Sequence, residues 1–148
     1  MSTDELDLKI VRALMANARL SYRELAHELS VSPTTVISRV EKLQNLGVIR
    51  GYSANIDFEK LGYELTAVTE ILVSKGKLLE MEREIAKLPG VCAVYDVTGE
   101  IDGIVVVKFK EREELSVFTK GLLTMPFVER ANTHLVLTTV REDFRVKV

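Results

Sequence analysis

Short hydroxyl and long cationic side chains gather along residues 32–45. Ser32 is a favourable helix N-cap, Pro33 fits the first helical position, and Gly47 can end the helix in a left-handed conformation. Three apolar residues at i, i+4 and i+7 predict a buried stripe: Val36, Val40 and Leu43. The opposite face carries five polar residues: Thr34, Thr35, Ser38, Arg39 and Lys42. Such side chains contact base edges and phosphates.

Two further helices are predicted before this one. Residues 4–16 form the first, with Ser2 or Thr3 as its cap, and Ser21 opens the second with Glu24 in capping-box spacing. A tight turn then leads to Ser32. Three short helices with this turn predict a helix-turn-helix, whose last helix enters a major groove. Two other interpretations stay open: a three-helix module that binds protein, and a helix whose polar face is simply solvated.

Each polar residue is given an expected role. Thr34, Thr35 and Ser38 are expected to reach base edges, and Lys42 a phosphate. Arg39 can read guanine, hold a phosphate or pair with a helix carboxylate. The start of the second helix offers amides and a cation to a phosphate. The predicted DNA-binding set is Ser21, Tyr22, Arg23, Ser32, Thr34, Thr35, Ser38, Arg39 and Lys42.

Composition limits the possible partners. The 148 residues carry a net charge of −2, and residues 1–50 hold seven Lys/Arg against six Asp/Glu. One copy therefore has too few cations for tight DNA binding, and two copies are expected to act together. The lone Cys92 suggests a reducing, cytoplasmic setting and is expected in the core. No apolar run approaches the length that crosses a bilayer, so no membrane partner is expected.

Residues 63–140 predict a sheet domain. Strands are expected at 63–74, 91–98, 104–110 and 128–140, with helices at 77–88 and 111–124. This β-α-β-β-α-β order is the ferredoxin-like unit, so the fold class is α+β. The strands are apolar on both sides, which favours a second copy covering the open face. The predicted domains are 1–50, a strand and linker at 51–62, and 63–148.

Taken together, the chain resembles the Lrp/AsnC, or feast/famine, transcription regulators. The resemblance lies in the pattern R-V-x-x-L-x-x-x-G-V-I at residues 39–49, then Leu61-Gly62-Tyr63, then G-x-x-D at residues 99–102. It implies a winged-helix-like domain that binds double-stranded operator DNA, and a ferredoxin-like domain that builds dimers and often octamers. It also implies a small-molecule effector, usually an amino acid, bound between dimers.

The turn at residues 99–102 is the candidate effector loop. Gly99 allows a sharp reversal, and Asp102 can accept from an α-ammonium group. The resemblance adds Thr133 on the last strand, although this chain has Glu100 and Ile101 where the family commonly has Asp and Tyr. The predicted effector-binding set is Gly99, Glu100, Ile101, Asp102 and Thr133. Two alternatives stay open: a plain hairpin turn, and a regulator without an effector.

Other functions were weighed against a regulator. Sirohaem decarboxylases are similar to this family in their two-domain plan, but the sheet domain offers only scattered basic residues for a carboxylate-rich tetrapyrrole. An architectural protein that wraps DNA is a further alternative. His27 and His134 are far apart without cysteines near them, so neither a metal site nor a cofactor is expected, and no catalytic motif is present.

Overall fold

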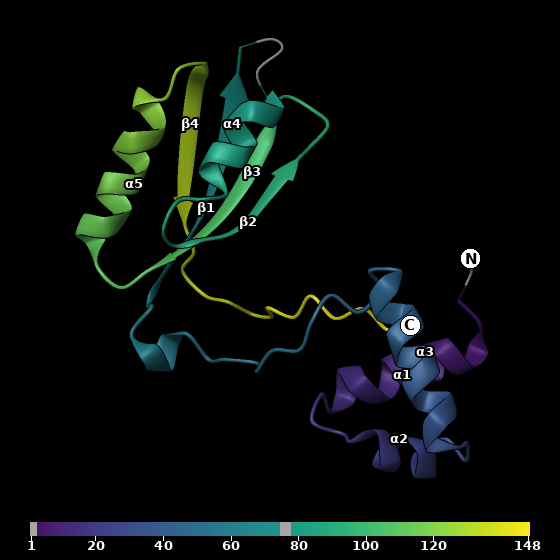
Figure 1. The fold of residues 1–148 in the computed structure, drawn as a ribbon. Helices are drawn as coiled ribbons and strands as arrows, with labels where there is room; N and C mark the ends of the chain where they lie inside the picture. Colours follow the sequence, from purple (N-terminus) through teal and green to yellow (C-terminus); the bar gives the residue numbers. More distant parts are fainter. Residues whose placement is uncertain (1–2, 75–77) are drawn as a thin grey trace. The chain divides into compact units, whose positions relative to one another are not determined.

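The computed structural model describes residues 3–74 and 78–148, and it divides the chain into two compact units (Figure 1). The first unit comprises residues 1–55 and 142–148, and the second comprises residues 56–141. The sequence had placed the last seven residues with the sheet domain. They group with the first unit because Arg12 and Arg145 donate hydrogen bonds to the carbonyl oxygens of Val148 and Met15, respectively.

Three helices build the first unit. They are α1 (Glu5–Ala16), α2 (Tyr22–Glu28) and α3 (Pro33–Asn45). The expected cap of α1 is wrong: Asp4 caps this helix in a reciprocal capping box with Asp7, Thr3 lies outside it, and Ser2 falls outside the described residues. An aspartate oxygen accepts from backbone amides as well as a hydroxyl does.

The apolar stripes of these helices meet in one core. Ile10 of α1 and Leu25 of α2 are fully buried, and so is the predicted stripe of α3: Val36, Val40 and Leu43. Gly47 follows α3 with a φ of +70°, which fits the predicted helix end. The core therefore holds α3 by its apolar side and leaves the other sides for function.

The linker differs from its prediction. Residues 50–57 carry no regular secondary structure, whereas strand character was expected at residues 49–56. A strand needs a neighbouring backbone to satisfy its amides and carbonyls. Among the described residues of a single copy, no strand pairs with this segment.

The second unit is a four-stranded antiparallel sheet with two helices. Its elements are β1 (Leu65–Val73), α4 (Leu78–Ile85), β2 (Val91–Asp96), β3 (Gly103–Phe109), α5 (Arg112–Thr124) and β4 (Val128–Leu135), after a short 3₁₀ turn, η1 (Glu59–Leu61). The strand order is β2-β3-β1-β4, so the predicted ferredoxin-like arrangement is confirmed. Lys77, the predicted start of α4, lies outside the described residues.

Alternation along the strands separates two faces of this sheet. Ala67, Ile71, Val105 and Val107 are buried together with the helix residues Ile85, Phe118 and Leu122. The residues between them point to the opposite face, where four are half-buried apolar side chains: Val68, Leu72, Ile104 and Val106. We call this second surface the open sheet face. None of the described helix residues packs in the core on this side, and its half-buried apolar side chains are typical of a surface that a partner covers.

Two local features depart from or extend the sequence analysis. Cys92 is exposed, because the pairing of β2 with β3 shifts between Val91 and Ala93 and leaves it at a bulge. Gly90 has a φ of +79°, and a Cβ there would lie 2.4 Å from Cε1 of Phe109. Only glycine fits at that position.

Candidate nucleic-acid interface

Serine caps hold α2 and α3 at the tight turn between them. Ser21 Oγ accepts from the Glu24 amide at 3.2 Å, and Glu24 Oε2 accepts from the Ser21 amide at 2.7 Å. Ser32 Oγ accepts from the Thr35 amide at 3.1 Å and also lies 2.8 Å from the Thr35 hydroxyl. Three of the predicted DNA-binding hydroxyls, those of Ser21, Ser32 and Thr35, therefore make contacts at helix caps and hold α2 and α3 in place.

The turn itself requires one left-handed residue. Ser30 has a φ of +54°, and the amide of Val31 donates to the carbonyl of Ala26 at 3.0 Å. This geometry ends α2 and redirects the chain into the Ser32 cap. The sequence predicts the turn but not its backbone conformation, because serine does not specify positive φ.

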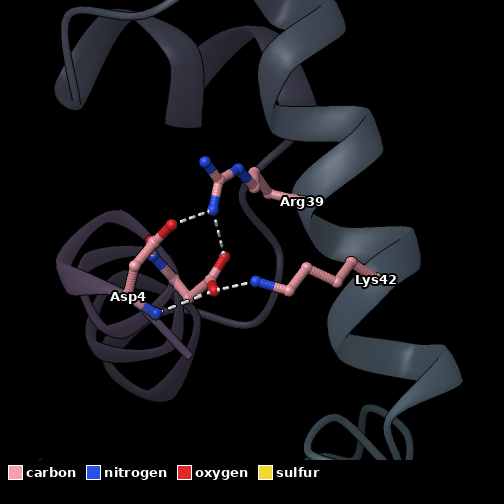
Figure 2. Close-up of polar contacts among 4 residues, drawn as sticks. Asp4, Arg39 and Lys42 are labelled. Carbon is pink, nitrogen blue, oxygen red and sulfur yellow. Dashed lines mark hydrogen bonds and ion pairs between the residues drawn. The ribbon is translucent and has the colours of Figure 1, made fainter. Parts of the chain in front are cut away.

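Arg39 and Lys42 turn toward α1 (Figure 2). Arg39 Nη1 donates to Asp7 Oδ1 at 3.1 Å and also to Asp4, and Lys42 Nζ lies 2.5 Å from Asp7 Oδ2. We call these four residues the α1–α3 ion-pair cluster. Both cations were expected on the outward face of the helix. They lie instead on the flank that faces α1, where Arg39 pairs with carboxylates.

Asp7 is the centre of this cluster. Its side chain is fully buried, whereas those of Arg39 and Lys42 are 31% and 27% exposed. Burial alone would raise the pKa of Asp7, but hydrogen bonds from Lys42, the Asp4 amide and Arg39 outweigh it and bring the pKa below the usual 3.8. A hydrogen bond from Arg39 likewise lowers the pKa of Asp4. The carboxylate is therefore charged near neutral pH and holds α3 against α1.

The surface left on α3 and α2 is mostly polar. Thr34 and Ser38 are exposed on α3, and Tyr22 and Arg23 are exposed at the start of α2. Arg50, after the end of α3, is exposed as well. These positions have the amides, hydroxyls and cations that a phosphate backbone and base edges can use.

Four of the predicted effector residues share the turn between β2 and β3, and the fifth, Thr133, lies on β4. Asp102 Oδ2 accepts from the Val73 amide at 2.8 Å, so this carboxylate ties the β2–β3 turn to the end of β1. Thr133 lies 2.9 Å from the Thr69 hydroxyl, four residues back along β1 from Val73. The Asp102 amide in turn donates to the Ile71 carbonyl at 2.9 Å, two residues along β1 from Thr69. Gly99 and Glu100 are exposed and Ile101 is half-buried in the turn.

A carboxylate that the sequence analysis passed over lies beside this turn. Glu82 on α4 has a buried Oε1, and among the described residues it finds no hydrogen-bond partner. Burial and then the nearby charge of Asp96 raise its pKa above the usual 4.5. A glutamate on an amphipathic helix gives no sequence signal of this, because its burial depends on how α4 packs on the sheet.

The described residues limit two other kinds of site. They contain no group of three or more His, Cys, Asp or Glu arranged to hold a metal ion. Among the helices described, none has the length and apolar character to cross a membrane.

A capped helix pair with a polar outer surface, followed by a ferredoxin-like unit, defines a class of two-domain DNA-binding regulators. Comparison with known families agrees. The AsnC-type helix-turn-helix domain matches residues 4–44, and the Lrp/AsnC ligand binding domain matches residues 66–146. The chain belongs to the Lrp/AsnC family and is a DNA-binding transcription regulator with a ligand-binding domain.

Relatives span the whole chain. An HTH-type transcriptional regulator of Pyrococcus abyssi is 49% identical over 144 residues, covering 97% of this chain and 98% of the relative. The structure of Escherichia coli AsnC is similar with a TM-score of 0.89 and 28% identity over all of both chains. A Neisseria meningitidis transcriptional regulator, solved as a complex with L-Met, has a TM-score of 0.86 and 26% identity, covering 98% of this chain and 96% of that one.

Proposed function

We propose that this regulator binds operator DNA as a dimer, with one α3 helix in each of two successive major grooves. The observation that carries the proposal is the capped α2–α3 pair, whose outer surface is polar while its apolar side is fully buried. Two copies of α3 would be spaced by about 34 Å, one DNA turn, or by a multiple of it.

The nine predicted DNA-binding residues divide into two roles in this proposal. Thr34 and Ser38 contact base edges, and Tyr22 and Arg23 contact the phosphate backbone, since all four are exposed on α3 or at the start of α2. The other five position the helices: Ser21, Ser32 and Thr35 through capping, and Arg39 and Lys42 through the α1–α3 ion-pair cluster.

Salt dependence of binding tests this division. The probe is a duplex selected from a random library by the unmodified full chain. If Arg23 contacts a phosphate in each half-site, Arg23→Ala should reduce the slope of log affinity against log salt by about 1.8. Substituting both cations of the cluster should change the slope by far less than the roughly 3.6 expected for four lost phosphate contacts.

Lys120→Ala, at an exposed position of α5, is the matched control and should leave the slope unchanged. A large slope change for the double variant Arg39→Ala/Lys42→Ala would show that both residues contact phosphates and would contradict this division. No selected sequence at all would contradict operator binding.

The open sheet face supports dimerisation through the second unit. Its apolar residues are only half-buried in one copy, and an identical face satisfies the isologous contact of a two-fold dimer. We infer that dimers associate further into an octamer, following the family resemblance. The expected result is a mass of eight chains by light scattering; a mass of two chains would contradict the octamer, and a monomer bound to DNA would contradict the dimer as well.

We also infer that an amino acid modulates binding from the second unit. The ligand binding domain match and the L-Met complex of the Neisseria meningitidis regulator support this inference. Such a ligand must raise the thermal midpoint of the protein, because it binds only the folded state. A panel of the twenty amino acids with no thermal shift would instead favour an effector-free regulator.

Two alternatives gain no support. The relatives are named as transcriptional regulators, which are not enzymes, so we do not propose a decarboxylase-like activity. An architectural protein would select no sequence from the library.

We place the protein in the cytoplasm because a regulator of this family acts on chromosomal DNA.

A further inference from the structure

The α1–α3 ion-pair cluster decides which side chains α3 can present to DNA. Val36, Val40 and Leu43 occupy its buried side, and Arg39 and Lys42 are drawn to Asp7 on one flank. Over residues 34–41 of the helix, the side chains left exposed are Thr34, Ile37, Ser38 and Glu41. They are spaced i, i+3, i+4 and i+7, so they share one surface, which we call the outer stripe.

Two of these residues, Ile37 and Glu41, were not among the predicted DNA-binding residues. We propose that they determine sequence specificity: Ile37 contacts the C5-methyl group of a thymine, and Glu41 accepts a hydrogen bond from the N4 amino group of a cytosine. The proposal deepens the operator-binding function above and rests on it.

The chemistry of Ile37 fits a thymine methyl. Its side chain is 38% exposed although it lies between Thr34 and Glu41 on a polar surface. A β-branched residue in a helix keeps essentially one χ1 rotamer, so its methyl groups point in a fixed direction. Among the bases, only thymine presents an apolar group in the major groove. Closing DNA over Ile37 would bury its exposed surface against that group.

The chemistry of Glu41 fits an amino group rather than a phosphate. Its carboxylate lies one helical turn beyond Ile37 and is exposed, and among the described residues no ion pair engages it. A carboxylate is repelled by phosphates, so a position close to DNA raises the free energy of binding unless a donor meets it. Cytosine N4 is the major-groove donor that carboxylates accept from. Glu41 would thus lower general affinity and increase discrimination.

The test of Ile37 removes one methyl group from the DNA. The probe is the library-selected operator with each thymine in turn replaced by deoxyuridine. One replacement should weaken binding of the unmodified full chain about fourfold, the effect expected for one methyl group. Ile37→Ala should weaken binding to the intact operator and make it insensitive to that same replacement. Val117→Ala, an exposed apolar truncation on α5, is the matched control.

The test of Glu41 compares general and specific affinity. Glu41→Gln should bind random duplex DNA more tightly, while its preference for one C·G pair falls by about fivefold or more. Glu113→Gln, at an exposed position of α5, should change neither quantity.

The outcomes distinguish the specificity roles of Ile37 and Glu41 from operator binding itself. If deoxyuridine replacements act equally on the unmodified chain and Ile37→Ala, and Glu41→Gln keeps every base preference, the proposal is overturned while operator binding stands. If the unmodified chain selects no sequence, operator binding itself fails. Circular dichroism of each variant checks that its helices remain folded.

Discussion

Replacing Asp7 by Asn should destabilise the first unit strongly, because it removes a fully buried charge that links α1 to α3. Asp7 Oδ1 accepts from Arg39, and Oδ2 accepts from Lys42 and from the Asp4 amide at 3.0 Å. Asparagine keeps one acceptor and replaces the other with an NH₂ group, which would face donors at hydrogen-bonding distance. The substitution therefore breaks at least one charge-assisted contact and creates a donor–donor conflict.

The size of the effect follows from the exposure of the partners. Removing one partner from a fully buried ion pair costs about 3–5 kcal/mol. Here the side chains of Arg39 and Lys42 remain 31% and 27% exposed, so water can rehydrate them in part. We expect a loss of about 2–3 kcal/mol in the free energy of unfolding, near the value for hydrogen bonds to charged groups.

Urea unfolding of the full chain measures this loss. The helical circular dichroism signal is recorded as the urea concentration is raised in small steps. The helical first unit should unfold at lower urea in the variant. Asp4→Asn is the comparison, and its effect should be smaller because the Asp4 side chain is 50% exposed. Equal stability of Asp7→Asn and the unmodified chain would refute the buried ion-pair cluster.

Three further predictions concern other parts of the chain. The pKa of Asp7 is lowered in the folded state, so its stabilising contribution is present above about pH 4 and is lost as pH falls through the folded pKa. Measuring the unfolding of the first unit at decreasing pH should show this loss of stability. In Asp7→Asn the share of the loss that comes from Asp7 should be absent. The pKa of Glu82 is raised, so the effect of pH on stability is opposite to that of Asp7: the charged form of Glu82 opposes folding at neutral pH. Glu82→Gln should therefore raise the free energy of unfolding by about 1 kcal/mol at pH 7. Calorimetry should find this gain reduced at pH 4. Gly90→Ala should lower the free energy of unfolding by about 2–4 kcal/mol, because the new Cβ would meet the Phe109 ring and the backbone is left-handed. Gly47→Ala has a similar φ but open space around it, so it should lower the free energy of unfolding by only about 1 kcal/mol. Similar melting temperatures for the two variants would contradict the packing argument.

Much of the fold was readable from the sequence because it depends on local periodicity. The spacing of Val36, Val40 and Leu43 predicted which side of α3 is buried, and all three are fully buried. The serine caps at residues 21 and 32 were also predicted, since a cap involves residues only three apart. The strand and helix order of the second unit followed from the same kind of short-range pattern.

The cap of α1 and the linker show where local patterns mislead. Asp4 and Ser2 are both acceptable caps by type, and only the packed helix shows that Asp4 starts it. Strand-like composition in residues 50–57 does not produce a strand, since pairing depends on a distant backbone.

The sequence by itself determined most of the helices and strands and which of their sides are apolar, because these depend on local periodicity. Tertiary structure alone decided where the polar side chains go. Arg39 and Lys42 look like DNA contacts on the isolated helix, but a carboxylate more than thirty residues earlier in the chain draws them to α1. Asp102 is similarly bound to the Val73 amide. Charged side chains are long and their attraction acts through space, so their partners are set by the packing of distant elements.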